Sequence, residues 1–196
     1  MEVPYTVEAR PDTGLSNGKL GIWLFLASEV MLFGALFATY LMLRIGNPDW
    51  PLGTDYLNPL WATINTAVLI TSSVTMVMAW VHVSKGNWDK FRLFMFITVA
   101  LGLVFMVIKG VEYSEKFHHG YTPDKHVFLA IYFTLTGLHG LHVLGGMVVN
   151  AYFAICGKKM FDSNRQWLAN RVENSGLFWH FVDLVWIFLF PILYLL

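Results

Sequence analysis

This chain of 196 residues has little charge and almost no cysteine. Charged residues make up 13% of it, about half the usual share in soluble proteins. Lys plus Arg and Asp plus Glu number 13 each, so the net charge is zero, which excludes nucleic acid as a natural partner because phosphate binding needs a basic surface. The single cysteine, Cys156, excludes a disulfide scaffold and a cysteine-rich metal site. Hydrophobic residues at 56% and aromatic residues at 16% exclude disorder and indicate an integral membrane protein.

Five long apolar runs dominate the sequence. Each is continuous rather than alternating, which favours helices over the strands of a barrel. Four of them reach the roughly 20 residues that cross a bilayer, and the third does so if Lys109 extends its charge to the membrane interface. The predicted spans are 20–43, 60–81, 93–111, 127–156 and 174–196. We therefore expect an all-α membrane bundle of five helices over 20–196, preceded by a polar segment at 1–19 without a cleavable signal peptide.

The distribution of basic residues predicts the orientation in the membrane. Nine Lys and Arg residues fall in the segments on the side of the N-terminus, and four fall on the other side. Because cytoplasmic loops carry the excess of basic residues, the N-terminus and the segment 1–19 are predicted to be cytoplasmic and the C-terminus periplasmic.

Ionisable residues inside the predicted spans are candidate functional residues, because each is costly in lipid. Counting residues from the helix ends places Glu29, His142 and Asp183 in one layer. A carboxyl group at that depth is expected to be a neutral hydrogen-bonded acid or to pair with a histidine. Glu29 fits a proton-handling or lipid-contacting role as well as a structural one. For Asp183 a structural role is favoured, because His180 lies one helical turn away.

Two histidines, His139 and His142, form the motif H-G-L-H in the fourth span. Their spacing places both rings on one helix face, where a metal or haem site is chemically possible. No carboxylate or cysteine accompanies them locally, and the surrounding glycines let helices approach closely. Hydrogen bonding between helices is the favoured interpretation, and we predict no metal ligand and no catalytic residue in this chain.

Two further polar groups have structural explanations. Lys109 and Glu112, three residues apart near the end of the third span, are expected to form an ion pair at the membrane interface. Asparagine, serine and threonine residues form a polar stripe along 65–75 in the second span. We expect this stripe to hydrogen-bond to neighbouring helices, with a water-lined path as the alternative.

Motifs in each span resemble a known family. The last two spans carry T-G-L-H-G-L-H-V at 136–143 and W-H-F-V-D-L-V-W at 179–186. Earlier spans carry S-E-V-M-L-F at 28–33, I-N-T-A-V-L-I-T-S-S-V-T at 64–75 and E-Y at 112–113. In this order they resemble the helices of subunit III of haem–copper terminal oxidases, over nearly the whole chain.

The resemblance implies an accessory subunit without haem or copper. Such a subunit packs directly on subunit I of an oxidase that also contains subunit II, reduces oxygen to water and pumps protons; haem and copper reside in the partner subunits. It binds phospholipid in a cleft, and it supports proton uptake and the lifetime of the catalytic centre. Glu29 matches the family's buried carboxyl group. His139, His142, His180 and Asp183 match positions that join helices and border the cleft, and are not metal ligands.

The chain has fewer predicted spans than some members of the family. Mitochondrial-type members have seven helices, and this chain begins at the equivalent of their third. We expect another, small subunit to supply the two helices that are missing here. The five-helix form implies a location in a bacterial plasma membrane. The electron donor, cytochrome c or quinol, stays open. Alternatives are an accessory subunit of a nitric oxide reductase, a small proton-coupled transporter using Glu29 and Asp183, and a membrane cytochrome with His139 or His142 and His180 as haem ligands.

Overall fold

The computed structural model describes residues 14–195, and its regular structure is entirely helical over that range. The helices are α1 (Asn17–Ile45), α2 (Gly53–Tyr56), α3 (Pro59–Ser84), α4 (Trp88–His118), α5 (Val127–Cys156), α6 (Lys158–Ser163), α7 (Arg165–Phe190) and the π-helix η1 (Pro191–Leu195). Five of them are long and apolar enough to cross a membrane. The predicted all-α fold with five membrane helices is therefore confirmed, whereas its orientation in the membrane stays a prediction. Most of the predicted N-terminal segment, 1–13, lies outside the described residues.

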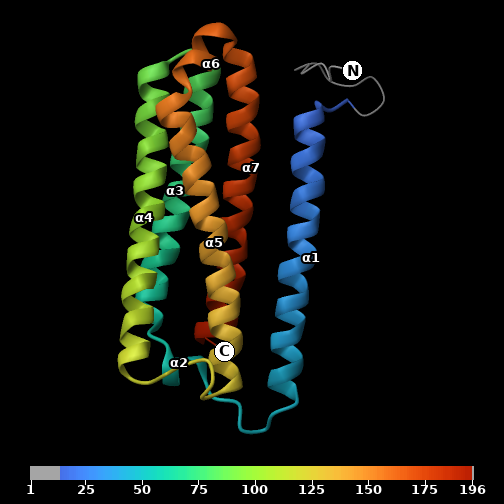
Figure 1. The fold of residues 1–196 in the computed structure, drawn as a ribbon, viewed down its shortest axis with the longest axis vertical. Helices are drawn as coiled ribbons and strands as arrows, with labels where there is room; N and C mark the ends of the chain where they lie inside the picture. The colour runs from blue at the N-terminus through green and yellow to red at the C-terminus, as the bar shows by residue number, and fades with distance from the viewer. Residues whose placement is uncertain (1–13, 196) are drawn as a thin grey trace.

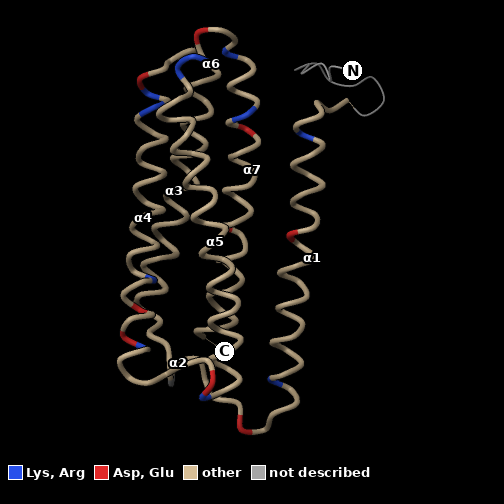
Figure 2. Tube along the Cα trace, in the orientation of Figure 1, with Lys and Arg blue, Asp and Glu red and all other residues tan. Residues whose placement is uncertain are grey.

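Four helices form the body of the molecule, and the fifth stands beside them. Helices α3, α4, α5 and α7 run side by side as a bundle, and α1 contacts this bundle through α7 and α5 (Figure 1). The short α6 and the beginning of α1 lie at one end, which we call the α6 end. The short α2 and η1 meet at the other, the α2 end. Charged residues gather at these two ends, and few lie along the middle of the helices (Figure 2).

Several helices are longer than the predicted spans, because polar turns extend them at the two ends of the bundle. Helix α4 begins at Trp88 and ends at His118, so that it extends beyond 93–111 at both ends. Helix α7 begins at Arg165 rather than at 174, because Asn164 caps it by accepting a hydrogen bond from the backbone N–H of Trp167 at 3.0 Å. Apolarity marks only the part of a helix that lies in hydrocarbon, so polar turns beyond it escape the prediction.

Close helix contacts in the bundle are built around Trp179 of α7, which is 1% exposed. A Cβ atom on Gly146 of α5 would lie 2.7 Å from the ring of Trp179, and one on Gly102 of α4 would lie 3.0 Å from it. The indole N–H donates to Ser72 of α3 at 3.0 Å. One tryptophan therefore contacts three helices, and the two glycines provide its space.

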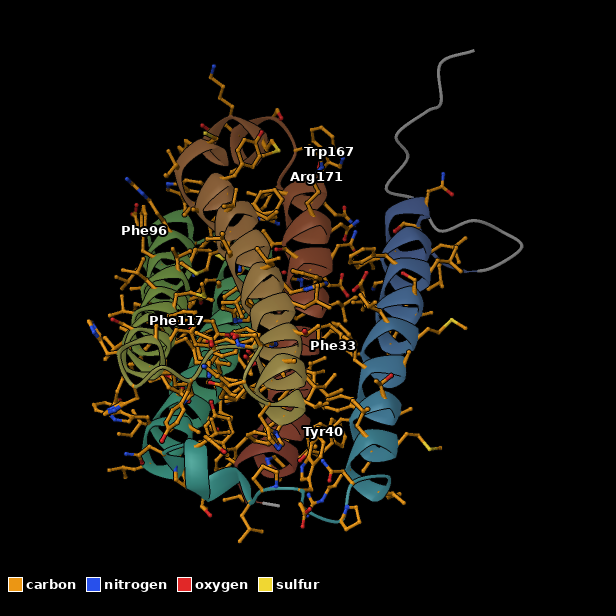
Figure 3. All side chains as sticks on the ribbon, turned by 60° about the horizontal axis from the view of Figure 1, so that its bottom comes forward. Phe33, Tyr40, Phe96, Phe117, Trp167 and Arg171 are labelled. Atoms are coloured by element: carbon orange, nitrogen blue, oxygen red, sulfur yellow. The ribbon has the colours of Figure 1, made fainter. Side chains whose placement is uncertain are left out.

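Helix α1 is joined to the bundle along a single narrow face. Its buried residues are Leu26, Phe33 and Tyr40, seven positions apart, which is the spacing of one helix face. Phe33 and Tyr40 point from α1 toward the bundle (Figure 3). The Tyr40 hydroxyl donates a hydrogen bond to the Ile192 carbonyl oxygen at 3.0 Å. Most of the rest of α1 is exposed, so this helix is the least embedded of the five.

Candidate functional site

Glu29 and His142 meet between α1 and α5. The carboxyl Oε2 of Glu29 lies 2.8 Å from Nε2 of His142, and the two side chains are 13% and 15% exposed. The other ring nitrogen, Nδ1, lies 2.8 Å from the Leu138 carbonyl oxygen, so it carries a hydrogen and donates to that carbonyl. One further proton is then shared between Nε2 and the carboxyl group. The pair can hold that proton as a neutral acid and base or as an ion pair.

Aromatic rings pack against the histidine of this pair. The ring of Phe33 meets His142 edge-on, with centroids 5.3 Å apart, and the ring of Phe178 lies 6.3 Å from it. Phe178 in turn lies 5.9 Å from Phe25 of α1. These contacts give the pair a largely apolar surrounding, which strengthens the electrostatic interaction between the two side chains.

A groove lies between α1, α5 and α7 on the other side of Phe25 and Phe178. Its volume is about 550 Å³, within the range of small-molecule sites. The lining is mainly apolar, and comprises Ile22, Phe25, Gly145, Val149, Phe153, Arg171, Asn174, Ser175 and Phe178. Arg171 and Asn174 provide charge and hydrogen-bonding groups, and Arg171 lies near the beginning of α7 (Figure 3). The groove thus has the shape and polarity to hold one apolar chain with a polar group at one end.

His180 and Asp183 lie on the opposite side of α7, against α3. Nδ1 of His180 is 2.6 Å from the Ser73 hydroxyl oxygen. Asp183 is 5% exposed and lies beside the same serine. No described residue forms a hydrogen bond of good geometry with either oxygen of its carboxyl group. The expected contact between His180 and Asp183 is thus replaced by a contact of each with Ser73 of the neighbouring helix.

His139 occupies a different interface from His142, although the H-G-L-H spacing predicted one shared face. Its ring stacks on Trp186 with centroids 5.3 Å apart and meets Phe105 edge-on at 5.6 Å. It is fully buried, and neither ring nitrogen has a hydrogen-bond partner among the described residues. A separation of three residues still leaves a rotation of about 60° around the helix axis, which is enough to direct His142 to α1 and His139 into the bundle.

The three histidines therefore face three different neighbours. His142 contacts α1, His180 contacts α3, and His139 is packed between α4 and α7. Over residues 14–195, no three side chains of the His, Cys, Asp and Glu types are grouped so that they could hold a metal ion. This arrangement does not favour haem ligation by a pair of these histidines.

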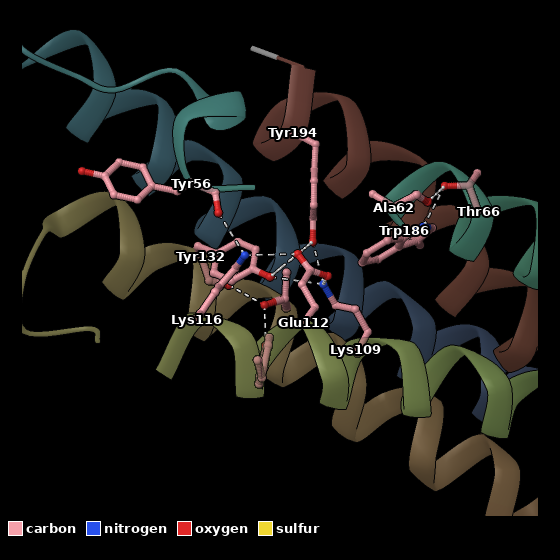
Figure 4. Close-up of polar contacts among 11 residues, drawn as sticks. Tyr56, Ala62, Thr66, Lys109, Glu112, Lys116, Tyr132, Trp186 and Tyr194 are labelled. Atoms are coloured by element: carbon pink, nitrogen blue, oxygen red, sulfur yellow. Dashed lines mark hydrogen bonds and ion pairs between the residues drawn. The ribbon is translucent and has the colours of Figure 1, made fainter. Parts of the chain in front are cut away.

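The predicted pair of Lys109 and Glu112 belongs to a buried ionic cluster near the α2 end, whose other members were not predicted from the sequence. Lys109 of α4 donates to Glu112 at 2.9 Å, to the Tyr194 hydroxyl at 2.6 Å and to the Tyr132 hydroxyl at 3.3 Å (Figure 4). These three acceptors match the three hydrogens of an ammonium group. Its Nζ also lies 5.0 Å from the centre of the Trp186 ring. The lysine is thus held from four sides by α4, α5, α7 and the C-terminal η1.

Glu112 is equally well satisfied in this cluster. The hydroxyls of Tyr132 and Tyr194 donate to its Oε1 at 3.0 and 2.8 Å, and Lys116 lies 3.5 Å from the same oxygen. Lys109, Glu112 and Lys116 are all at most 6% exposed. The predicted ion pair of Lys109 and Glu112 is therefore confirmed, but its predicted location at the interface is wrong, because α4 continues to His118 and the pair is buried inside the bundle. The spacing of three and four residues, which places the three charges on one helix face, was the available signal.

The polar stripe of α3 joins helices, as predicted. The indole N–H of Trp186 donates to Thr66 at 3.0 Å, and that of Trp179 donates to Ser72. The Thr75 hydroxyl lies 2.8 Å from that of Thr98 on α4. These bonds connect α3 to both of its neighbours and confirm the interpretation of the stripe as a set of helix–helix contacts.

Comparison with known proteins finds relatives of one kind that match nearly the whole chain. The family model described as cytochrome c oxidase subunit III matches residues 9–196. Cytochrome c oxidase subunit 3 of Bacillus subtilis (strain 168) is 34% identical over 195 residues, which cover 97% of this chain and 93% of the relative. Cytochrome bo(3) ubiquinol oxidase subunit 3 of Pseudomonas aeruginosa is 34% identical over 200 residues, covering 100% of this chain and 92% of the relative. Probable quinol oxidase subunit 3 of Staphylococcus epidermidis is 35% identical over 197 residues, covering 97% and 94%.

These relatives are bacterial, and they match this chain over nearly their full lengths. Together with the five membrane helices, they identify a multi-pass bacterial membrane protein. The resemblance that the motifs indicated is confirmed by both comparisons. The chain belongs to the cytochrome c oxidase subunit III family.

Proposed function

We propose that this chain is a non-catalytic accessory subunit of a proton-pumping respiratory terminal oxidase that reduces oxygen to water. The observation that carries the proposal is the match of the whole chain to subunit III of both cytochrome c and quinol oxidases. In this proposal, haem and copper reside in the partner subunits, and this chain carries neither. The separate environments of His139, His142 and His180 are consistent with the location of haem in other subunits.

The proposed partners are subunit I, in direct contact, and subunit II, with another subunit supplying the two further helices of the longer family members. The proposed orientation places the α6 end in the cytoplasm. Basic residues support it, because they are concentrated at that end: Lys19, Lys85, Lys90, Arg92, Lys158, Lys159, Arg165 and Arg171. The basic residues at the other end that are not buried are Arg44, which is half-buried, and Lys125, which is exposed.

The groove beside α1 is the proposed phospholipid site. Its apolar lining from α1, α5 and α7 suits an acyl chain, because burial of each methylene group stabilises binding by about 0.8 kcal/mol. Arg171 lies near the beginning of α7, where a lipid phosphate of the α6-end leaflet would reside. A guanidinium group is well suited to phosphate recognition.

The pair of Glu29 and His142 is the proposed proton-handling group. One proton shared across 2.8 Å in an aromatic surrounding can move between the two side chains without changing the net charge of the site. We propose that this pair supports proton uptake and prolongs the catalytic lifetime of the complex.

The test is the replacement Glu29→Gln in the intact complex. The glutamine amide keeps the size of the side chain and can donate to Nε2 of His142, so assembly and haem content are expected to stay normal. The number of turnovers before inactivation, or the rate of proton uptake, is expected to change. Glu115→Gln, at an exposed position, is the matched control. Unchanged lifetime and proton uptake would contradict the proton-handling role, and failure of the complex to assemble would show that Glu29 is a structural residue.

A further inference from the structure

A polar site lies within the membrane span, on the outer side of the contact between α3 and α7. His180 is the seventh residue of the apolar run 174–196, about 9 Å from its beginning at 1.5 Å per residue. Its Nδ1 is engaged by Ser73, whereas its Nε2 has no partner among the described residues, and the ring is only partly buried. Asp183 is buried beneath the same serine, with both carboxyl oxygens lacking a hydrogen bond to any described residue.

Apolar side chains surround this polar centre on both helices. We call the surface the α3–α7 seam, and define it by Ile70, Ser73, Val77, His180, Leu184 and Ile187. The spacing of three and four residues places the members from each helix on one face. The four apolar members are 49%, 44%, 49% and 44% exposed, in that order. The seam thus resembles an interface core, with hydrogen-bonding groups at its centre and an apolar rim in the plane of the bilayer.

Lipid acyl chains cannot form hydrogen bonds with the polar groups of such a surface. The hydrocarbon core is about 30 Å thick and offers no hydrogen-bond donor or acceptor, so an unpaired imidazole nitrogen inside it is unfavourable when it faces acyl chains. Polar residues in membrane spans are accordingly found against other helices or in hydrated cavities. Mid-membrane polar side chains also associate helices, through hydrogen bonds across the contact.

The opposite side of the bundle provides the contrast. Helix α4 exposes Leu103, Val104, Val107 and Val111 at 56%, 42%, 57% and 58%. These side chains form an apolar strip without a polar group among them, which is the surface expected to face lipid. The two faces therefore have similar exposure and differ in their unpaired polar groups.

We propose that the α3–α7 seam is the docking surface for a transmembrane helix of another subunit of the complex, one that carries a hydrogen-bonding side chain at the depth of His180 and opposite its ring. The partner side chain completes the series Asp183, Ser73 and His180 by pairing with Nε2, and its apolar neighbours cover Leu184 and Ile187. This inference rests on the proposed function, because it requires a complex. It adds to that function the face of the chain and the chemistry that recognises the partner.

The test uses a photo-crosslinking amino acid placed at single positions in the intact complex, in its own membranes. Seam positions Val77 and Leu184 are compared with Val107 and Val111 of α4, which are similarly exposed. We expect crosslinks from the seam positions to another protein subunit of the haem-containing complex, and crosslinks from α4 to lipid only. Protein crosslinks from α4 together with lipid crosslinks from the seam would overturn the inference while leaving the proposed function intact. Absence of any haem-bearing protein from all four preparations would instead contradict the proposed function.

A steric variant provides an independent measurement. Leu184→Trp adds bulk to an exposed position of the seam without altering the packing of the bundle, and Val107→Trp does the same on α4. We expect Leu184→Trp to speed the loss of this chain from the detergent-purified complex at least about tenfold, with Val107→Trp unchanged. His180→Leu is expected to have an effect of the same order. Equal retention of the Leu184→Trp and Val107→Trp chains would overturn the inference.

Discussion

Replacement of Lys109 by methionine should strongly destabilise the folded chain. Methionine approximates the aliphatic chain of lysine and removes the ammonium group. Glu112 then loses its donor at 2.9 Å, and Tyr194 loses the donor at 2.6 Å. Removal of one partner from a buried ion pair costs about 3–5 kcal/mol, because the remaining charge is left in a medium of low polarity. Lys116 and two tyrosine hydroxyls still reach Glu112, so we expect the lower end of this range, about 3 kcal/mol.

The free energy of unfolding can be measured by titrating the detergent-solubilised chain with a denaturing detergent. Tryptophan fluorescence is a suitable signal, since Trp186 lies 5.0 Å from the Lys109 ammonium group. Lys125→Met, at an exposed position, is the control and should change stability by no more than about 0.5 kcal/mol.

A double variant separates the lost pair from a general packing defect. Lys109→Met combined with Glu112→Gln removes both charges, so it should cost less than the sum of the two single changes. A change below about 0.5 kcal/mol for Lys109→Met, equal to that of the Lys125 control, would refute the assignment of this cluster as a major structural element.

Two further predictions concern helix packing. Gly146→Ala should destabilise the chain by about 1–3 kcal/mol relative to Gly145→Ala, because the added methyl group meets a tryptophan ring at the first position and nothing within 4 Å at the second. The two midpoints of unfolding measure this difference, and equal midpoints would show that the close helix contact is not formed. Tyr40→Phe should cost about 1 kcal/mol by leaving the Ile192 carbonyl unpaired, and Tyr152→Phe, at an exposed position, is the control. Equal stability of the Tyr40→Phe and Tyr152→Phe chains would contradict the contact between α1 and the C-terminal segment.

The fold was largely predictable because hydrocarbon imposes strict rules on sequence. A membrane helix must be apolar over about 20 residues and must satisfy its own backbone, so continuous apolar runs locate the five helices. Their ends were less predictable. Helix α7 begins at Arg165 because a polar first turn, capped by Asn164, lies beyond the apolar run. Residue composition within the bilayer contains no information about such extensions.

The depth of the candidate site residues in the membrane was predictable from the sequence. The side chains that they contact were not. Counting residues placed Glu29 and His142 at one level, and the structure brings them to 2.8 Å. The direction of each ring around its helix axis depends on how the helices are packed, which is why His139 and His142 were assigned to one face. Tyr194 could not be foreseen in the ionic cluster, because it reaches Lys109 from 85 positions away through the path of the C-terminal segment.

The central claim is that this chain accompanies a haem-bearing oxidase and binds no haem itself. The most direct measurement is a reduced-minus-oxidised optical spectrum of the tagged chain, purified in mild detergent, before and after its partners are removed. We expect haem bands that identify an oxidase in the first spectrum and no haem bands in the second. Haem that stays with the isolated chain would contradict the account and make its histidines ligands. Absence of haem from both preparations would contradict the proposal of an oxidase complex. It would favour a transporter that uses Glu29 and Asp183.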